Sequence, residues 1–295
     1  MHPLTRRTAL KTTASAALLA AAAPFTRAQE AANMLYRSTK GRIKQSVVPW
    51  CFNPMPAEEL ALFAVAMGLK SVELIDPKHW PMLKELDLTV AIAGSHGFSK
   101  GFAHKEEWDE CLAKLRPRIE ESAAFGCERV ITFSGFRRGL SDDEGIANMV
   151  EGLKKIVPFA EEKKVTLCLE MLNSRVATEM KGHPDYFCDS MERSIEICRQ
   201  IGSPRMKILF DLYHVQIMHG DVITRLKQHK DYIAHVHTAG VPGRNEIDDT
   251  QELNYPALMQ ALLDIGYTGF VGQEFIPSRE DKMASLAQGV RICDI

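Results

Sequence analysis

The sequence has very little net charge. Its 36 Lys and Arg residues nearly balance 38 Asp and Glu residues, which leaves a formal charge of −2 at pH 7. Proteins that bind nucleic acids or anionic lipid surfaces usually carry a basic excess or a basic patch. The balance therefore disfavours both kinds of partner and leaves a small molecule as the expected substrate.

Paired cysteines are also missing. The seven cysteines are odd in number and irregularly spaced, and no two of them form a C-x-x-C pair. This pattern excludes a disulfide framework. We expect each thiol to act as a small buried apolar side chain. The seven are Cys51, Cys111, Cys127, Cys168, Cys188, Cys198 and Cys293.

A Gly-rich phosphate-binding turn is absent as well. Residues 52–55 follow the first expected strand and read Phe-Asn-Pro-Met. An open, doubly wound sheet usually has glycines at that turn, so their absence argues against such a sheet. No internal repeat is present, and no low-complexity tract occurs beyond the N-terminal segment.

The remaining pattern is a regular alternation of apolar runs and amphipathic helical segments. Hydrophobic residues make up 45% of the chain, which is ordinary for a globular protein. Eight strand–helix units in ~250 residues predict an α/β fold, a single-domain (β/α)8 TIM barrel over residues 45–295. The predicted strands are 46–51, 71–75, 88–95, 129–133, 165–171, 206–211, 232–238 and 269–275. The predicted helices are 56–69, 78–86, 106–125, 142–163, 185–201, 214–229, 255–265 and one after 278.

The first 28 residues have a different composition. Arg6 and Arg7 precede an Ala-rich, uncharged stretch from Thr12 to Pro24, and Thr26-Arg27-Ala28 resembles a small-residue cleavage site. This layout predicts a cleavable twin-arginine signal peptide. A helical N-terminal anchor is the alternative, but the apolar run is short for a bilayer span.

These features predict three segments: a signal peptide at 1–28, a polar linker at 29–44 and the barrel at 45–295. The mature protein is then periplasmic or secreted, with no membrane contact after cleavage. Clients of the twin-arginine route fold in the reducing cytoplasm before export, which is compatible with free thiols.

Four consecutive predicted strands end in a residue that can bind a metal: Glu170, Asp211, His237 and Glu274. Barrel active sites lie at the carboxyl ends of the strands. Any one of these residues alone is more often structural. Three carboxylates on one rim would repel one another unless a cation neutralised them. We therefore predict one divalent ion, Mg²⁺, Mn²⁺, Co²⁺ or Zn²⁺, held by the four residues.

The predicted site also suggests a reaction. A cation bound to neighbouring carbonyl and hydroxyl oxygens acidifies the C–H bond between them and stabilises an enediolate. Glu170 and Glu274 come from non-neighbouring strands, so they can flank a substrate and act as an acid/base pair. Aldose–ketose isomerisation and ketose epimerisation both follow from such a site.

Longer stretches around the strand ends carry a family resemblance. They are Leu169–Asn173, Asp211–Met218 with Gly220, His235–Glu246, Glu252–Pro256 and Gly266–Glu274. At these residues the chain resembles the xylose-isomerase-like barrel superfamily and, within it, the hydroxypyruvate isomerases. The resemblance covers most of residues 45–290. It implies a TIM barrel that interconverts hydroxypyruvate and tartronate semialdehyde.

The resemblance also implies residue roles. The four strand-end residues would be metal ligands, with Glu170 and Glu274 as the catalytic acid/base pair. His214 and Arg244 would contact the substrate, and a guanidinium can grip a carboxylate bidentately. Arg244 could instead be a turn residue in an exposed Pro-Gly loop. His96, at the end of the third predicted strand, is a further substrate-contact candidate.

Other interpretations stay open. Many hydroxypyruvate isomerases have Gln at the third ligand position, whereas His237 matches the ketose-epimerase pattern. An exported ketose 3-epimerase, or another sugar-modifying barrel enzyme, is therefore the main alternative. A non-catalytic periplasmic sugar-binding barrel is another, and the near-neutral charge argues against a DNA-repair endonuclease. Glu73 and Trp50 would line the pocket or serve the fold. A homo-oligomer is compatible with the resemblance.

Overall fold

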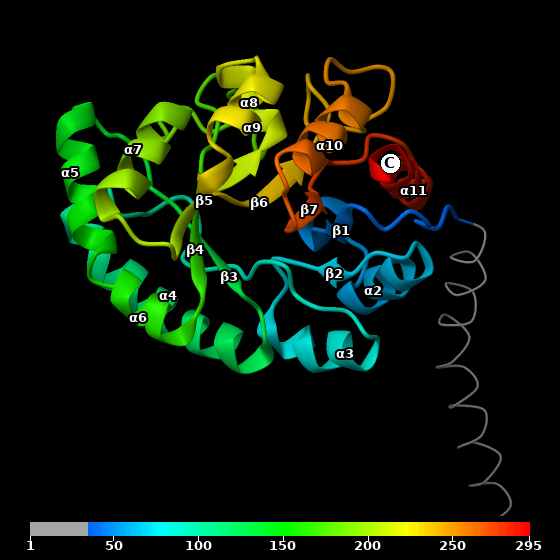
Figure 1. Ribbon diagram of the computed structural model, residues 1–295, viewed down its shortest axis with the longest axis horizontal. Coiled ribbons are helices and arrows are strands. Elements are labelled where there is room, and N and C mark those ends of the chain that lie inside the picture. Colours follow the sequence, from blue (N-terminus) through cyan, green and yellow to red (C-terminus); the bar gives the residue numbers. More distant parts are fainter. Residues whose placement is uncertain (1–34) are drawn as a thin grey trace, which may run out of the picture.

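The computed structural model describes residues 35–295, and the predicted signal peptide lies outside this range. Seven parallel strands form one sheet in the order β2-β1-β7-β6-β5-β4-β3, so the first and last strands are neighbours. Figure 1 shows the sheet curling around itself with helices on its outer side. The strands are β1 Lys44–Val47, β2 Ser71–Val72, β3 Arg129–Thr132, β4 Thr166–Glu170, β5 Met206–Asp211, β6 Ile233–Thr238 and β7 Phe270–Gln273.

The third predicted strand, 88–95, does not form a regular ladder. It makes isolated parallel bridges from Thr89 to Ser71 and from Ala93 to Val130. Between them, the Ala91 amide donates to the Ser71 hydroxyl at 2.8 Å, so a side chain replaces a backbone acceptor. The segment still lies between β2 and β3 and completes the predicted barrel order. Its irregularity comes from this local competition for the backbone donor.

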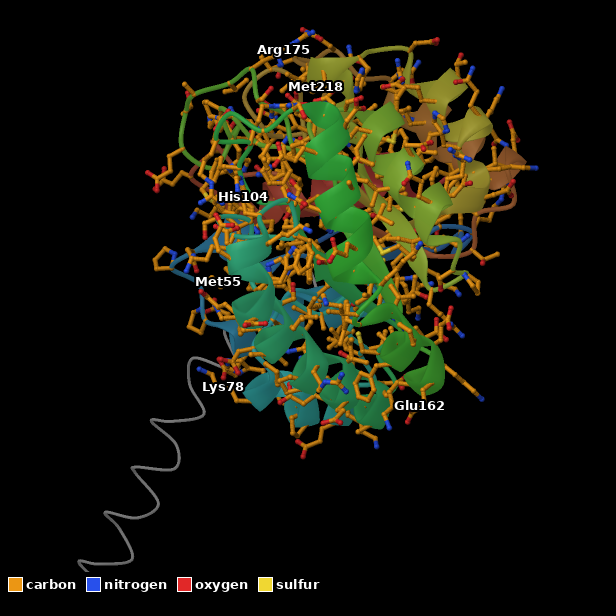
Figure 2. All side chains as sticks on the ribbon, turned by 90° about the vertical axis from the view of Figure 1, so that its left-hand side faces the viewer. Met55, Lys78, His104, Glu162, Arg175 and Met218 are labelled. Carbon is orange, nitrogen blue, oxygen red and sulfur yellow. The ribbon has the colours of Figure 1, made fainter. Side chains whose placement is uncertain are left out.

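Ten helices of the described chain surround the sheet. They are α2 Ala57–Ala66, α3 Trp80–Glu85, α4 Trp108–Phe125, α5 Asp142–Leu153, α6 Val157–Lys163, α7 Met191–Ile201, α8 Leu212–Met218, α9 Val222–Gln228, α10 Tyr255–Asp264 and α11 Lys282–Cys293. Figure 2 shows the helices of one flank lying side by side. In that view Glu162, which precedes β4, lies at the opposite end from Arg175, which follows it. The loops that follow the strands therefore gather at one end.

Two predicted helices are divided in the structure. The predicted helix 142–163 becomes α5 and α6, because Pro158 in the first turn of α6 has no amide to continue the hydrogen-bond ladder. The predicted helix 214–229 becomes α8 and α9, with a break at Gly220, whose φ is 66°. Pro117, by contrast, lies inside α4 without ending it. Ser141 caps α5, since its hydroxyl accepts from the Glu144 amide at 3.2 Å.

The strands are buried on both faces, as helix-covered parallel sheets require. All five residues of β4 are buried. All seven cysteines are free and buried in the core, as predicted. The end of the predicted linker belongs to the fold, because Tyr36 and Ser38 donate to the Asp294 carboxylate at 2.8 and 3.0 Å. Within residues 35–295, no helix has the length and apolar character needed to cross a membrane.

Candidate active site

Four side chains converge at the carboxyl end of the barrel. Glu170 and Asp211 are the last residues of β4 and β5, His237 lies in β6, and Glu274 follows β7 directly. One oxygen or nitrogen from each lies within 4.8 Å of those of the other three. All four residues are buried, with at most 5% of each exposed. The structure thus brings together the whole predicted ligand set.

Several polar atoms in this cluster have no hydrogen-bond partner among the described residues. They are Glu170 Oε1, Asp211 Oδ2 and His237 Nδ1. His237 Nδ1 lies 2.9 Å from Glu274 Oε2 and 3.6 Å from Glu170 Oε1, without the alignment of a hydrogen bond. Leaving such atoms buried and unpaired is costly. Carboxylate oxygens and one imidazole nitrogen facing one point are a donor set that fits a divalent cation.

Asp211 is held in place by the helix that it precedes. Its Oδ1 accepts from the amide of Tyr213 at 2.8 Å and caps α8, which leaves Oδ2 to face the cluster. Burial raises the pKa of Asp211, although the charge of Arg244 opposes this. The capping geometry therefore orients one carboxylate oxygen toward the proposed ion.

The pKa values of Glu170 and Glu274 are shifted in opposite directions. Burial raises the pKa of Glu170 to about 7, against the contact with His237 and with help from the charge of Glu274. Burial also acts on Glu274, but the charges of His237 and Arg244 outweigh it and lower the pKa to about 2. Near neutral pH one carboxyl group can therefore carry a proton while the other is ionised. Such a split is typical of acid/base pairs.

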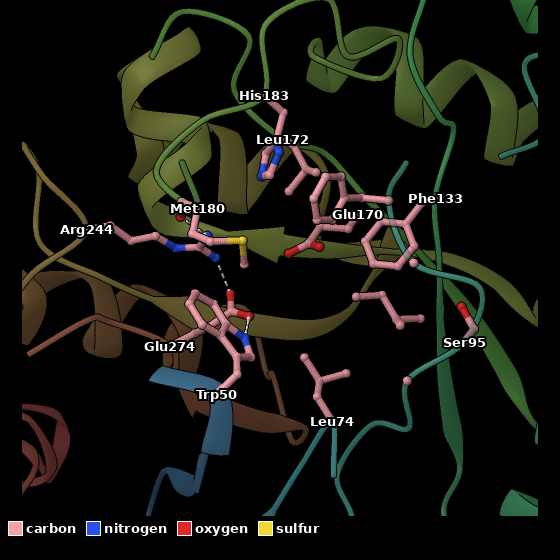
Figure 3. Close-up of a pocket in the computed structure, with 14 residues that line it drawn as sticks. Trp50, Leu74, Ser95, Phe133, Glu170, Leu172, Met180, His183, Arg244 and Glu274 are labelled. Atoms are coloured by element: carbon pink, nitrogen blue, oxygen red, sulfur yellow. Dashed lines mark hydrogen bonds and ion pairs between the residues drawn. The ribbon is translucent and has the colours of Figure 1, made fainter. Parts of the chain in front are cut away.

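Glu274 is held by two donors on the cavity wall, as Figure 3 shows. Arg244 Nη2 donates to Glu274 Oε2 at 2.6 Å, and Trp50 Nε1 donates to Oε1 at 3.2 Å. The guanidinium lies 5.1 Å from the Trp50 ring centre and also donates to the Met180 carbonyl at 2.7 Å. Arg244 is only 3% exposed. It is therefore a buried site residue and not an exposed turn residue.

His214 is near the cluster but does not line the described cavity. Its Nδ1 accepts from the backbone amide of Asn173 at 3.0 Å. Its Nε2 has no hydrogen bond among the described residues and lies 3.7 Å from Asp211 Oδ2. Burial and the charge of Arg244 lower the pKa of His214 well below its ordinary value, so the ring is neutral. The structure places it behind Asp211.

His96 is not brought into the site. Its Nδ1 contacts the Lys100 carbonyl at 3.1 Å, and its Nε2 contacts the Thr132 hydroxyl at 3.0 Å. The neighbours Ser95 and Gly97 line the cavity, while His96 does not. Both ring nitrogens serve local structure, which explains why this predicted substrate contact lies outside the cavity.

The cavity beside the cluster measures about 240 Å³. Trp50, Glu170, Arg244 and Glu274 line it, and most of the other side chains of the lining are apolar (Figure 3). These other side chains are Leu74, Phe98, Ile131, Phe133, Leu172 and Met180, with Ser95 and His183 as polar exceptions.

His183 was not foreseen from the sequence. It lies in the loop after β4, which turns back so that the His183 amide donates to the Asn173 carbonyl at 2.8 Å. Its ring lies 4.3 Å from the ring of Phe98, centre to centre. Burial and the charge of Arg244 lower its pKa to about 4. The residue does not stand directly at a strand end, so only the path of the loop shows that it reaches the cavity.

Comparisons with known proteins agree with this architecture. A family model described as "Xylose isomerase-like TIM barrel" matches residues 63–293. The "Putative hydroxypyruvate isomerase" of Homo sapiens is 28% identical over 245 residues, covering 81% of each chain. The 2-oxo-tetronate isomerase of Cupriavidus necator is 33% identical over 160 residues, covering 54% of this chain and 59% of that protein.

A solved structure gives the same result for the fold. The AP endonuclease, family 2 from Brucella melitensis superposes with a TM-score of 0.74 at 26% identity, covering 83% of this chain and 98% of that one. The names of the two sequence relatives agree with the predicted isomerase class. The barrel order, the strand-end cluster and the family match together show that the chain belongs to the xylose isomerase-like TIM barrel family.

Proposed function

We propose that the protein is a metal-dependent isomerase of small hydroxy-keto acids that works through an enediolate. The observation that carries this proposal is the buried cluster of three carboxylates and one imidazole, in which three polar atoms lack protein partners. A divalent ion held by Glu170, Asp211, His237 and Glu274 would polarise neighbouring carbonyl and hydroxyl oxygens of a substrate.

The two glutamates would move the proton. Glu170 and Glu274 both line the cavity, and they approach it from β4 and from the end of β7. Glu274, held ionised by the Arg244 guanidinium and oriented by Trp50, is suited to accept a proton from the substrate carbon. Glu170, which lies across the cavity from Glu274 and has a pKa of about 7 when no cation is bound, would return the proton.

The cavity favours a short substrate over a hexose. A hexose presents a hydroxyl on nearly every carbon, and each would need a partner once buried. Apart from Glu170, Glu274, Trp50 and Arg244, the lining offers Ser95 and His183 as its polar side chains, and the rest is apolar. Hydroxypyruvate and 2-oxo-tetronate, in the names of the relatives, are short acids of the expected kind.

The charge balance suits an anionic substrate. Three carboxylates against one divalent cation and the Arg244 guanidinium leave no net charge on the cluster. An acid substrate would then meet no repulsion. Arg244 already bonds Glu274 and the Met180 carbonyl, so its contribution here is its positive charge beside the cavity.

Proton exchange in deuterated water tests the proposal. The full chain, loaded with Mn²⁺ or Mg²⁺, is incubated with hydroxypyruvate, 2-oxo-tetronate or a panel of ketohexoses and followed by NMR. We expect isomerisation of a short acid with deuterium entering at the reacting carbon. Epimerisation of a ketohexose alone would favour the alternative enzyme, and the absence of any exchange would contradict both.

We also propose that the chain is exported by the twin-arginine route and acts in the periplasm or outside the cell. The support is Arg6-Arg7, the Ala-rich stretch and the small residues before Gln29. N-terminal sequencing of the fractionated native protein should find a start near Gln29 outside the cytoplasm. Retention of the intact N-terminus in the cytoplasm would refute export.

A further inference from the structure

A third buried glutamate lies on the other side of His237. Glu73 follows β2 directly and is fully buried. One of its oxygens, Oε1, accepts from His237 Nε2 at 2.8 Å and from His235 Nε2 at 2.9 Å. The His237 ring is thus bonded to Glu73 through one nitrogen, while its other nitrogen faces the metal cluster.

The position of Glu73 is unusual for a structural residue. Its side chain reaches from β2 toward β6, although β1 and β7 lie between these strands in the sheet order. Within the described chain its ion pairs are those with His235 and His237, and its second oxygen has no hydrogen bond. Burying a carboxylate in this way costs stability unless the charge interacts favourably with a partner.

The opposing strand leaves room for this carboxylate. Gly272 of β7 pairs with His237 in the sheet register. A Cβ atom at Gly272 would lie 2.2 Å from Glu73 Oε1 and 2.9 Å from His237 Cδ2. Any side chain at this position would displace the contact, so Gly272 makes the approach of Glu73 to His237 possible.

We propose that Glu73 is a positioning residue that orients His237 as a ligand and strengthens its bond to the metal. Because an ionised carboxylate can only accept, both histidines present N–H at Nε2, and once His237 is neutral, as a metal ligand must be, its lone pair lies on Nδ1. A carboxylate behind a ligating imidazole fixes its tautomer and raises its basicity. His235 shares the same oxygen and holds the carboxylate in place. This inference depends on the metal site of the proposed function.

Metal affinity of the full chain tests the role of Glu73. Binding of Mn²⁺ is titrated by calorimetry for wild type, Glu73→Gln and a control, Glu107→Gln, and the melting temperature of each chelator-treated protein is recorded. Glu107 is also a buried carboxylate, but it accepts from the Gly101 amide and Arg138 at 2.8 and 2.6 Å, away from the cluster. We expect Glu73→Gln to weaken Mn²⁺ binding by ~10–100-fold. Glu107→Gln should bind Mn²⁺ like wild type even if its melting temperature falls.

The outcomes separate this inference from the proposed function. If the wild-type protein binds no metal, the proposed function itself fails. If wild type binds Mn²⁺ and folded Glu73→Gln binds it equally well, Glu73 is merely structural and the inference is overturned. Should Glu73→Gln not fold, Glu73→Asp keeps the charge but draws it back by one methylene. Weaker Mn²⁺ binding and an altered visible spectrum of its Co²⁺ form would support positioning, and unchanged values would refute it.

Discussion

The two halves of the barrel contribute differently to the site. The half from β4 to β7 supplies the acids and the imidazole of the cluster from strands of four to six residues. The half from β1 to β3 contains the two-residue β2 and the irregular segment after it, and it supplies much of the apolar cavity wall. Its main polar contributions are Trp50 and Glu73, which contact Glu274 and His237 respectively. The β4–β7 half thus supplies the groups proposed to carry out the reaction. The β1–β3 half shapes much of the cavity and supports those groups.

The largest effect on activity should come from replacing the two proposed proton-transfer residues of the β4–β7 half. Glu170→Gln and Glu274→Gln should each slow deuterium exchange by ~10²–10⁴-fold, because a positioned acid or base contributes that much. Circular dichroism should show a folded protein. Ser95→Ala, also in the cavity lining, is the matched control and should keep exchange within a small factor. Near-normal exchange in either Gln variant would disprove the acid/base assignment.

Removal of the metal should destabilise the β4–β7 half more than the β1–β3 half. A ligand present at a hundred times its Kd stabilises the fold by about 2.7 kcal/mol, so chelation should lower the melting temperature and abolish turnover. Hydrogen exchange should rise at the ends of β4 to β7 more than at β1 to β3. Equal melting temperatures with and without chelator would argue against a bound ion.

Acidification should weaken metal binding. Burial and neighbouring carboxylates raise the pKa of Glu170 to about 7, and carboxylates raise that of His237 although burial opposes them. As the pH falls, protons compete with the ion for both residues, so the Kd should rise by up to about tenfold per pH unit per proton displaced.

The stability of the chelated protein should change with pH in the opposite sense. The folded state binds a proton at Glu170 more tightly than the unfolded chain, so stability decreases as pH rises from about 4.5 to about 7. Denaturant melts and Mn²⁺ titrations between pH 5 and 8 measure both trends. Parallel trends with and without metal would contradict this linkage.

The smallest effect should come from His183, a polar residue of the cavity lining outside the metal cluster. His183→Ala removes a polar group that faces the cavity beside Phe98, and we expect KM to rise by about tenfold or less with kcat nearly unchanged. Phe98→Leu serves as the control, because it alters packing and keeps the imidazole. A drop in kcat as large as that of Glu170→Gln would place His183 in the chemistry instead.

The regular half was predictable because its strands are long and end in polar residues. Predicted strands 206–211 and 232–238 match β5 and β6 closely, and the four predicted ligand residues meet as expected. The other half was less predictable. A side-chain hydroxyl of Ser71 interrupts the pairing of 88–95, and local hydrogen bonds turn His96 away from the cavity. Such competition between side-chain and backbone hydrogen bonds leaves no periodic pattern in the sequence.

The sequence by itself determined the alternation of strands and helices, the barrel that follows from it, and the strand-end position of Glu170, Asp211, His237 and Glu274. Parallel strands bring their carboxyl ends to one rim, so local pattern was sufficient. Only the tertiary structure decided that Glu73 lies behind His237 and that a folded-back loop brings His183 to the cavity. Those contacts join residues 164 and 85 positions apart in the sequence (Glu73–His237 and Phe98–His183). Whether such residues meet depends on how the whole barrel closes.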